Sequence, residues 1–186
     1  GRLRGEGGVV DACARQVTRD VDAREGDELE ARVRHAFELV REDLLPLHEG
    51  GATFNPDFLA RVREFRALRF MDWMMTNGSA QVTWEDRPRP DDATWMTKGV
   101  PVEIMVRLAN EVGADPWFNM PHRADDAYVA AFAGYVRDHL DPRLKAYVEW
   151  SNEVWNFIFP QANWAREQAL ARWGEGAGGD AWMQFA

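Results

Sequence analysis

Two carboxylates that could act as acid or base lie four residues apart in the segment YVEWSNEVWN, residues 147–156. Alternation along an extended strand would put Glu149 and Glu153 on the same side. A glutamate at a strand end can donate a proton to a leaving oxygen when burial raises its pKa towards neutrality, and the neighbouring amide of Asn152 can hydrogen-bond a substrate hydroxyl. The competing interpretation is that Glu153 caps the following turn or pairs with a surface arginine.

Polar side chains also follow two earlier apolar runs. We expect strands near residues 68–73, 115–120 and 145–151, separated by helical patterns, which is typical of βαβ units with a parallel sheet. No glycine-rich phosphate turn follows the first strand, which disfavours a doubly wound sheet. A (β/α) barrel instead places polar residues at the carboxyl ends of its strands. The residues in those places are Asp72, Trp73 and Asn77, then Asn119 and His122, then Asn152 and Glu153.

The length of the chain limits this barrel. A complete (β/α)8 barrel needs roughly 200 residues or more, whereas the sequence has 186. We therefore predict an α/β fold that is a partial (β/α)8, or TIM, barrel of about four βα units, in residues 54–186. Residues 1–53 are charged, contain glycines and are expected to form a helical or irregular N-terminal segment.

Start and stop signals place the helices. In the N-terminal segment, apolar spacing predicts a helix over residues 27–45, which Pro46 ends. Asn55 and Pro56 are typical of the N-cap and the first position of the next helix.

In the second half of the chain, one helix is expected to end at Gly113, another to be capped by Asp125 or Asp126, and another to start near Pro160. The helix after the aspartates is expected to turn a set of apolar side chains inward, namely Val129, Phe132, Ala133 and Val136.

Three segments together resemble clan A glycoside hydrolases, which are (β/α)8 barrels: LRFMDWMMTNGS, GVPVEIMVRLANEVGADPWFNMPH and YVEWSNEVWN. Over residues 54–186 the chain looks like bacterial proteins labelled cellulose-binding. The resemblance implies that Glu153 is the general acid/base and that Asn152 contacts the sugar 2-hydroxyl. It also implies that Arg69 is the barrel arginine that supports the nucleophile and that His122 lines the sugar site.

These residues also have structural interpretations. Arg69 could be the buried partner of Glu149, because a charge inside a barrel must be paired, and His122 could be an ordinary turn histidine that caps a helix. We expect Glu149 to be structural rather than catalytic. Further contacts to a sugar are expected from Trp73, Asn77, Asn119 and Trp155, and a cleft wall from Trp84 and Trp95.

Two functions compete. The resemblance implies a retaining glycoside hydrolase that acts on β-linked polysaccharide, which needs a second carboxylate about 5 Å from the first. In the clan this is a glutamate on the seventh strand, so the rest of the barrel is expected from missing C-terminal sequence or from another chain. The alternative is a non-catalytic module that binds cellulose or another glucan through tryptophans and amides. A metal site at His122, Asp125 and Asp126 is disfavoured, because the aspartates suit a helix start, and we expect no metal or cofactor.

The composition argues against several partners. A net charge of −9, with 22 Lys and Arg against 31 Asp and Glu, disfavours nucleic acid. No run of about 18 apolar residues could cross a membrane. The single cysteine, Cys13, excludes an intrachain disulfide and a multi-thiolate metal site. No signal peptide is visible in the sequence, which begins with Gly1, so an extracellular location is expected only from the family's polysaccharide substrates.

Overall fold

The computed structural model describes residues 40–175 and 180–185, and the chain divides into two compact units, residues 1–58 and 59–186. The first unit contains a 3-10 helix, η1 (Glu42–Leu44), followed by α2 (Leu45–Glu49) and the start of α3 (Pro56–Val62).

Two predictions of helix ends fall in the first unit, one at Pro46 and one at Asn55. The prediction that Pro46 ends a helix was wrong, because Pro46 lies in the first turn of α2, where a missing backbone N–H removes no helical hydrogen bond. Residues 27–39 of that predicted helix lie outside the described residues. The predicted N-cap of α3 is confirmed, since Asn55 Oδ1 accepts a hydrogen bond from the backbone N–H of Asp57 at 2.8 Å.

The second unit is built on a small parallel sheet, so the predicted mixed α/β class is confirmed. Its three strands are β1 (Ala67–Arg69), β2 (Asp115–Met120) and β3 (Tyr147–Trp150), in the order β1-β2-β3. All pairs are parallel, which places the carboxyl ends of the three strands at one edge. The strand order follows the sequence, which is common for strands joined by βαβ connections.

The first strand is shorter than its apolar run predicts. Residues 68–73 were expected to be extended, but β1 ends at Arg69. Beyond it the chain turns at once, with Met74 N–H bonded to the carbonyl of Phe70 at 2.8 Å and Met75 at a φ of 47°. Asp72 and Trp73 therefore lie in a turn after the strand rather than in the strand itself.

The two faces of the sheet differ. Phe118 on β2 points towards the helices, with its ring 5.0 Å from that of Phe132 in α5 (Asp126–His139). Residues of the opposite parity point the other way, and among them Trp117 and Tyr147 are 37% and 38% exposed. The first face is packed against helices at β2 but not at β3, where Val148 is 65% exposed, and the other face is only partly covered within the described residues.

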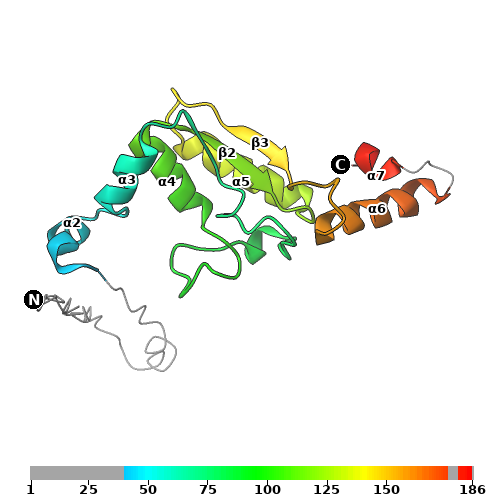
Figure 1. Ribbon diagram of the computed structural model, residues 1–186, viewed down its shortest axis with the longest axis horizontal. Coiled ribbons are helices and arrows are strands. Elements are labelled where there is room, and N and C mark those ends of the chain that lie inside the picture. Colours follow the sequence, from blue (N-terminus) through cyan, green and yellow to red (C-terminus); the bar gives the residue numbers. More distant parts are fainter. Residues whose placement is uncertain (1–39, 176–179, 186) are drawn as a thin grey trace, which may run out of the picture. The chain divides into compact units, whose positions relative to one another are not determined.

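Two helices lie along the packed face. The helices α4 (Val102–Val112) and α5 run side by side along the sheet (Figure 1). The predicted end of α4 is confirmed, because Gly113 adopts the left-handed conformation and returns its N–H to the carbonyl of Ala109. Asp125 is the N-cap of α5, since its carboxylate accepts the N–H of Tyr128 at 2.7 Å.

The buried face of α5 is rotated from the predicted one. Phe132 and Val136 are buried as expected, but Val129 is 39% exposed and Ala133 is also exposed. The reason is a non-local contact: Trp84 packs edge-on against Tyr128 and Phe132, which makes Tyr128 part of the core. Val129 and Ala133 instead line an apolar groove of about 380 Å³ between α5 and β3.

The chain then forms α6 (Pro160–Trp173), which begins at the predicted proline, and α7 (Ala181–Phe185). The two helices pack through aromatic rings, with the ring of Phe185 5.6 Å from Trp164 and 6.4 Å from Trp173. None of the helices in residues 40–175 and 180–185 is long and apolar enough to cross a membrane.

Candidate functional site

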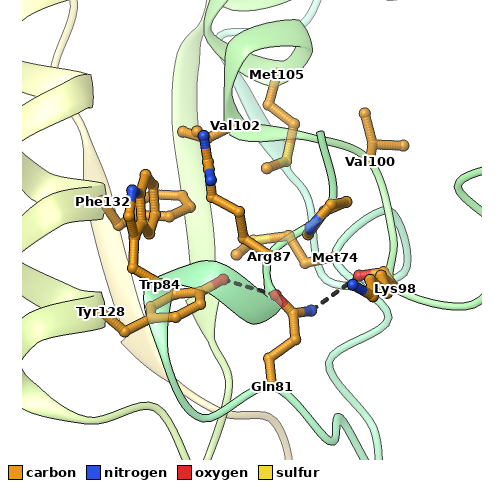
Figure 2. Close-up of a pocket in the computed structure, with 11 residues that line it drawn as sticks. Met74, Gln81, Trp84, Arg87, Lys98, Val100, Val102, Met105, Tyr128 and Phe132 are labelled. Carbon is orange, nitrogen blue, oxygen red and sulfur yellow. Dashed lines mark hydrogen bonds between the residues drawn. The ribbon is translucent and has the colours of Figure 1, made fainter. Parts of the chain in front are cut away.

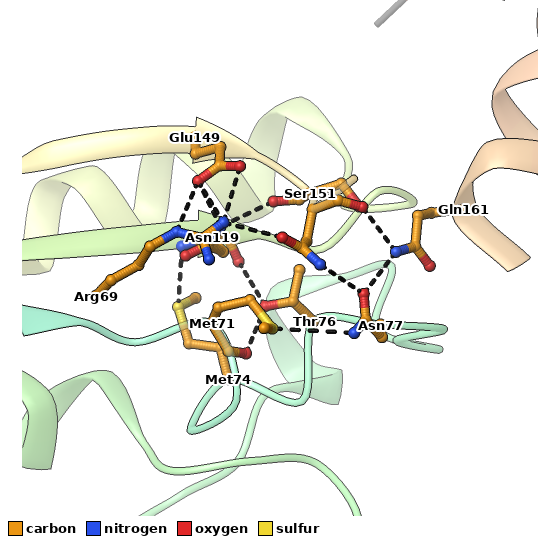
Figure 3. Close-up of polar contacts among 10 residues, drawn as sticks. Arg69, Met71, Met74, Thr76, Asn77, Asn119, Glu149, Ser151 and Gln161 are labelled. Carbon is orange, nitrogen blue, oxygen red and sulfur yellow. Dashed lines mark hydrogen bonds and ion pairs between the residues drawn. The ribbon is translucent and has the colours of Figure 1, made fainter. Parts of the chain in front are cut away.

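An ion pair joins the two outer strands of the sheet at their carboxyl ends. Arg69 donates three hydrogen bonds to the carboxylate of Glu149, two from Nη2 at 2.8 and 3.0 Å and one from Nε at 3.1 Å (Figure 3). Asn119, on the central strand between them, donates its amide to Glu149 Oε2 at 2.8 Å. The predicted pairing of Arg69 with Glu149 is confirmed, and it leaves Glu149 engaged by two neighbouring strands. The pair is not buried as expected, because the side chains of Arg69 and Glu149 are 36% and 31% exposed.

The turn after β3 carries the Asn-Glu pair in an unusual backbone conformation. Ser151 has a φ of 58° and Glu153 a φ of 43°, a left-handed region that costs residues other than glycine about 1 kcal/mol or more each. Asn152 between them is 4% exposed. Surrounding contacts must therefore hold this turn in place.

The side chain of Asn152 supplies two of those contacts. Its Oδ1 accepts a hydrogen bond from Arg69 Nη2 at 2.9 Å, and its Nδ2 donates to Asn77 Oδ1 at 3.0 Å. The structure thus brings together four of the residues proposed from the sequence, namely Arg69, Asn77, Asn119 and Asn152, in one polar network at the ends of the strands.

Gln161, in the first turn of α6, belongs to the same network and was not recognised from the sequence. Its Nε2 donates to Asn77 Oδ1 at 2.7 Å and to the backbone carbonyl of Asn152 at 2.8 Å. Its Oε1 accepts the N–H of Gly78 at 3.0 Å. Its partners in the loop lie more than 80 positions away in the sequence, and no local pattern around Gln161 predicts that it is fully buried.

Glu153 faces solvent. It is exposed, and its Oε2 accepts a hydrogen bond from Asn156 Nδ2 at 3.1 Å, while its backbone carbonyl accepts the N–H of Asn156 at 2.8 Å. These two contacts with Asn156 resemble the turn-capping role considered from the sequence. The carboxylate of Glu153 is nevertheless accessible to solvent.

His122 is buried as a neutral ring. It is 4% exposed, and burial, together with the positive charge of Arg123, lowers its pKa to about 4. Its ring lies 5.4 Å from Trp164 of α6 in an edge-to-face arrangement. At neutral pH it can therefore donate or accept a hydrogen bond without carrying charge.

Hydrogen-bonding capacity is left over at the ends of β2 and β3. Five buried side-chain atoms in the described part of the chain have no partner, and three of them cluster there: Asn119 Oδ1, His122 Nδ1 and Ser151 Oγ. Buried polar atoms of this kind are rare in native proteins, because leaving them unpaired is costly. A buried water or a group of a ligand can complete the hydrogen bonding of such atoms.

The aromatic residues proposed as sugar contacts differ in exposure. Trp155, two positions after Glu153, is 61% exposed, which suits a ring that stacks on a ligand. Trp73 is half-buried, and its ring lies 5.6 Å from Phe70 at a tilt of 36°.

The long connection between β1 and α4 is folded against the helices rather than open. Trp84 stacks under the guanidinium of Arg87 at 4.3 Å, and Tyr128 donates its hydroxyl to Gln81, which in turn donates to the carbonyl of Lys98 (Figure 2). The cavity beneath has a volume of only about 10 Å³, room for about one water molecule. The cavity beneath Trp84 is therefore too small to hold a sugar.

No metal-ligand set is present in the part of the chain that the structure describes: no three histidine, cysteine or acidic side chains gather there. Asp125, considered as a ligand, is the cap of α5.

No family model matches the sequence, and comparisons with curated proteins and with solved structures found no similar protein. The fold and the site alone therefore define the class: a mixed α/β protein with a parallel sheet and a polar network at the carboxyl ends of its strands.

Proposed function

We propose that the chain is carbohydrate-active and that its site, at the carboxyl ends of β1, β2 and β3, is of the retaining glycoside hydrolase type, acting on β-linked polysaccharide. Glu153 is the general acid/base in this proposal. The residues assigned to sugar binding are Arg69, Trp73, Asn77, Asn119, His122, Asn152 and Trp155. A polysaccharide substrate also implies that the protein works outside the cell.

Two features of the sheet support a partial (β/α)8 barrel. The strands are parallel and adjacent in sequence order, and the packed helices α4 and α5 follow β1 and β2. Open α/β sheets carry helices on both faces, whereas a barrel has helices on its outer face and side chains packed inside. The partly exposed rings of Trp117 and Tyr147 on the other face fit a barrel interior.

The observation that carries the proposal is the unpaired polar capacity at the strand ends, next to Glu153. Asn119 and His122 lie at the end of β2 and Ser151 at the end of β3, and each keeps a buried atom without a partner. Sugar hydroxyls both donate and accept hydrogen bonds. Because these atoms have less than 1 Å² of exposed surface, a sugar can satisfy them only if the strand ends open on binding. Trp155 adds an exposed ring that can stack on a pyranose face.

Proton donation makes two demands. The substrate must cover Glu153, because an exposed acid donates poorly at neutral pH. A second carboxylate must lie about 5 Å away for retention, and Glu149 is unsuited to that role because Arg69 and Asn119 hold it. The hydrolase proposal therefore requires a second carboxylate other than Glu149.

The second candidate is a module that binds glucan without cleaving it. It is favoured by the exposure of both Glu153 and Trp155, which suits the capture of a polymer more directly than proton transfer. Both candidates predict binding, and only the first predicts cleavage.

Calorimetric titration of the 186-residue chain with cellohexaose, xylohexaose and mannohexaose tests the shared part. We expect one of them to bind, and Trp155→Ala to weaken its affinity by about tenfold, which corresponds to about 1.4 kcal/mol of stacking. Trp173→Ala, the same change in the last turn of α6, should alter affinity by less than about twofold. Failure of all three sugars to bind, or equal affinities of the wild type and Trp155→Ala, would refute the proposal.

Release of reducing sugar separates the two candidates. We expect little or no turnover from the chain alone, since the resemblance puts the second carboxylate on a seventh strand. In any form that does release sugar, Glu153→Gln should lower kcat by about 100-fold or more while binding is retained. Undiminished turnover in Glu153→Gln would exclude the acid/base role and leave the binding module.

A further inference from the structure

We propose that Gln161 is a positioning residue, which sets the conformation of the Asn152–Glu153 turn and so couples α6 to the candidate site. The inference rests on the proposed function for its meaning, because it names what controls the geometry of that same site. Gln161 is fully buried, and all three of its described hydrogen bonds join α6 to residues of the site or its supporting loop.

The first part of the argument is the strain in the turn. Asn152 lies between two residues at positive φ, Ser151 and Glu153. Such conformations persist only when the surroundings impose them. On the amino side of the turn, Asn119 provides this by donating to the carbonyl of Ser151 at 2.9 Å, and the N–H of Ser151 donates to the carbonyl of Met120.

On the carboxyl side, Gln161 provides the corresponding restraint. Its Nε2 holds the backbone carbonyl of Asn152 at 2.8 Å, which fixes the peptide plane leading directly to Glu153. The same nitrogen holds Asn77 Oδ1 at 2.7 Å, and Asn77 Oδ1 also accepts from the side chain of Asn152. Gln161 therefore restrains the backbone of Asn152 directly and its side chain indirectly, through the Asn77 oxygen to which both side chains donate.

The third bond ties in the loop after β1. Gly78 donates its N–H to Gln161 Oε1 at 3.0 Å, so one amide group joins the loop that carries Asn77 to the turn that carries Glu153. Figure 3 shows the bond from Gln161 to Asn77. A glutamine suits this place because it offers both a donor and an acceptor at one end of the side chain. Neither a carboxylate nor an apolar side chain can make all three bonds.

A set of substitutions separates positioning from general stability. Gln161→Glu keeps the shape of the side chain and the acceptor for the N–H of Gly78. When it is ionised it has no donor, and its carboxylate then lies against two acceptor oxygens, Asn77 Oδ1 and the carbonyl oxygen of Asn152. Protonation at lower pH restores one donor, and the two facing oxygens favour the protonated form. Gln161→Met has no donor at any pH. Gln168→Glu makes the same charge change in the same helix, away from the network.

Affinity for the hexasaccharide that the wild type binds, chosen among cellohexaose, xylohexaose and mannohexaose, is measured at pH 8.5 and 5.5. We expect Gln161→Glu to bind about tenfold more weakly than the wild type at pH 8.5 and less than about threefold more weakly at pH 5.5. Gln161→Met should be about tenfold weaker at both, and Gln168→Glu should match the wild type. Wild-type affinity of a folded Gln161→Glu at pH 8.5, or an equal loss at both pH values, would overturn the inference.

A second measurement keeps the inference independent of the proposed function. Backbone amide shifts of residues 151–156 are compared by nuclear magnetic resonance in the wild type, Gln161→Glu and Gln168→Glu. Changes confined to Gln161→Glu that shrink at pH 5.5 support the positioning role even if no sugar binds, in which case only the carbohydrate proposal fails. Unchanged shifts in Gln161→Glu would sink the positioning role whatever the protein binds.

Discussion

The buried ring of His122 links protonation to unfolding, and the size of the effect can be worked out. The pKa of His122 is about 4 in the folded protein, against an ordinary value of 6.5. Between these values the unfolded chain binds more protons than the folded one, so stability falls as the pH is lowered. The contribution is fully present above about pH 6.5 and is lost progressively towards pH 4, by about 2 kcal/mol at pH 5 and about 3 kcal/mol at pH 4.

Urea unfolding at pH 7.5 and 5.0 measures this loss. A variant without a titrating group at position 122 is measured in parallel, so that the effect of all other titrating groups can be subtracted. His122→Gln cannot take up a proton, so the fall in its unfolding free energy should be smaller than that of the wild type by about 2 kcal/mol. Carboxylates contribute equally to both proteins and cancel in the difference.

Direct titration decides the matter if His122→Gln does not fold. The ring signal of His122, followed by nuclear magnetic resonance, should show a midpoint near 4. A midpoint at or above about 6 would mean that the ring is hydrated or paired with an acid, and the reasoning from burial would be refuted. Equal pH dependence of the wild type and His122→Gln would refute it as well.

Two further predictions concern backbone geometry, each checked by denaturant unfolding with a paired substitution as control. Gly99→Ala should destabilise the protein by about 3 kcal/mol or more, because a Cβ there would lie 2.5 Å from the carbonyl oxygen of Trp73 at a φ of +92°. Gly113→Ala, at a φ of +71° with open space around it, should cost only about 1 kcal/mol. Equal losses in the two variants would contradict the clash. Asp125→Ala should cost about 1 kcal/mol through loss of the N-cap of α5, whereas Asp126→Ala should cost clearly less, and a reversed order would contradict the assignment of the cap.

Local signals in the sequence predicted the helix ends well. Asn55, Gly113 and Asp125 act within three or four residues of themselves, so their roles can be read without knowing the fold. The central strand was also found, because Asp115–Met120 is apolar and bounded by turn residues. Its length was right because those turn residues bound it on both sides. The first strand, β1, was predicted too long because apolar composition does not distinguish a strand from a buried turn, as Phe70 and Met74 show.

The candidate site was predictable only in part. Parallel strands bring their carboxyl ends to one edge, which is why Arg69, Asn119 and Asn152 could be grouped from sequence. Gln161 could not, because a buried glutamine has no periodic signature and its role depends on a loop far away in the sequence. Trp84 likewise altered the buried face of α5 through a contact that helical periodicity does not contain.

At Glu153 the left-handed backbone conformation lowers the stability of the fold, while the side chain carries the proposed chemistry. Glycine adopts a φ of 43° without steric penalty, so Glu153→Gly should relieve about 1 kcal/mol of strain. A selection for thermal stability alone would therefore favour glycine there and discard the carboxylate on which the proposed catalysis depends. A lineage that uses this carboxylate must keep the strained residue, and one that only binds polymer is free to lose it. The residue found at this position among natural variants would thus record which of the two functions has been under selection.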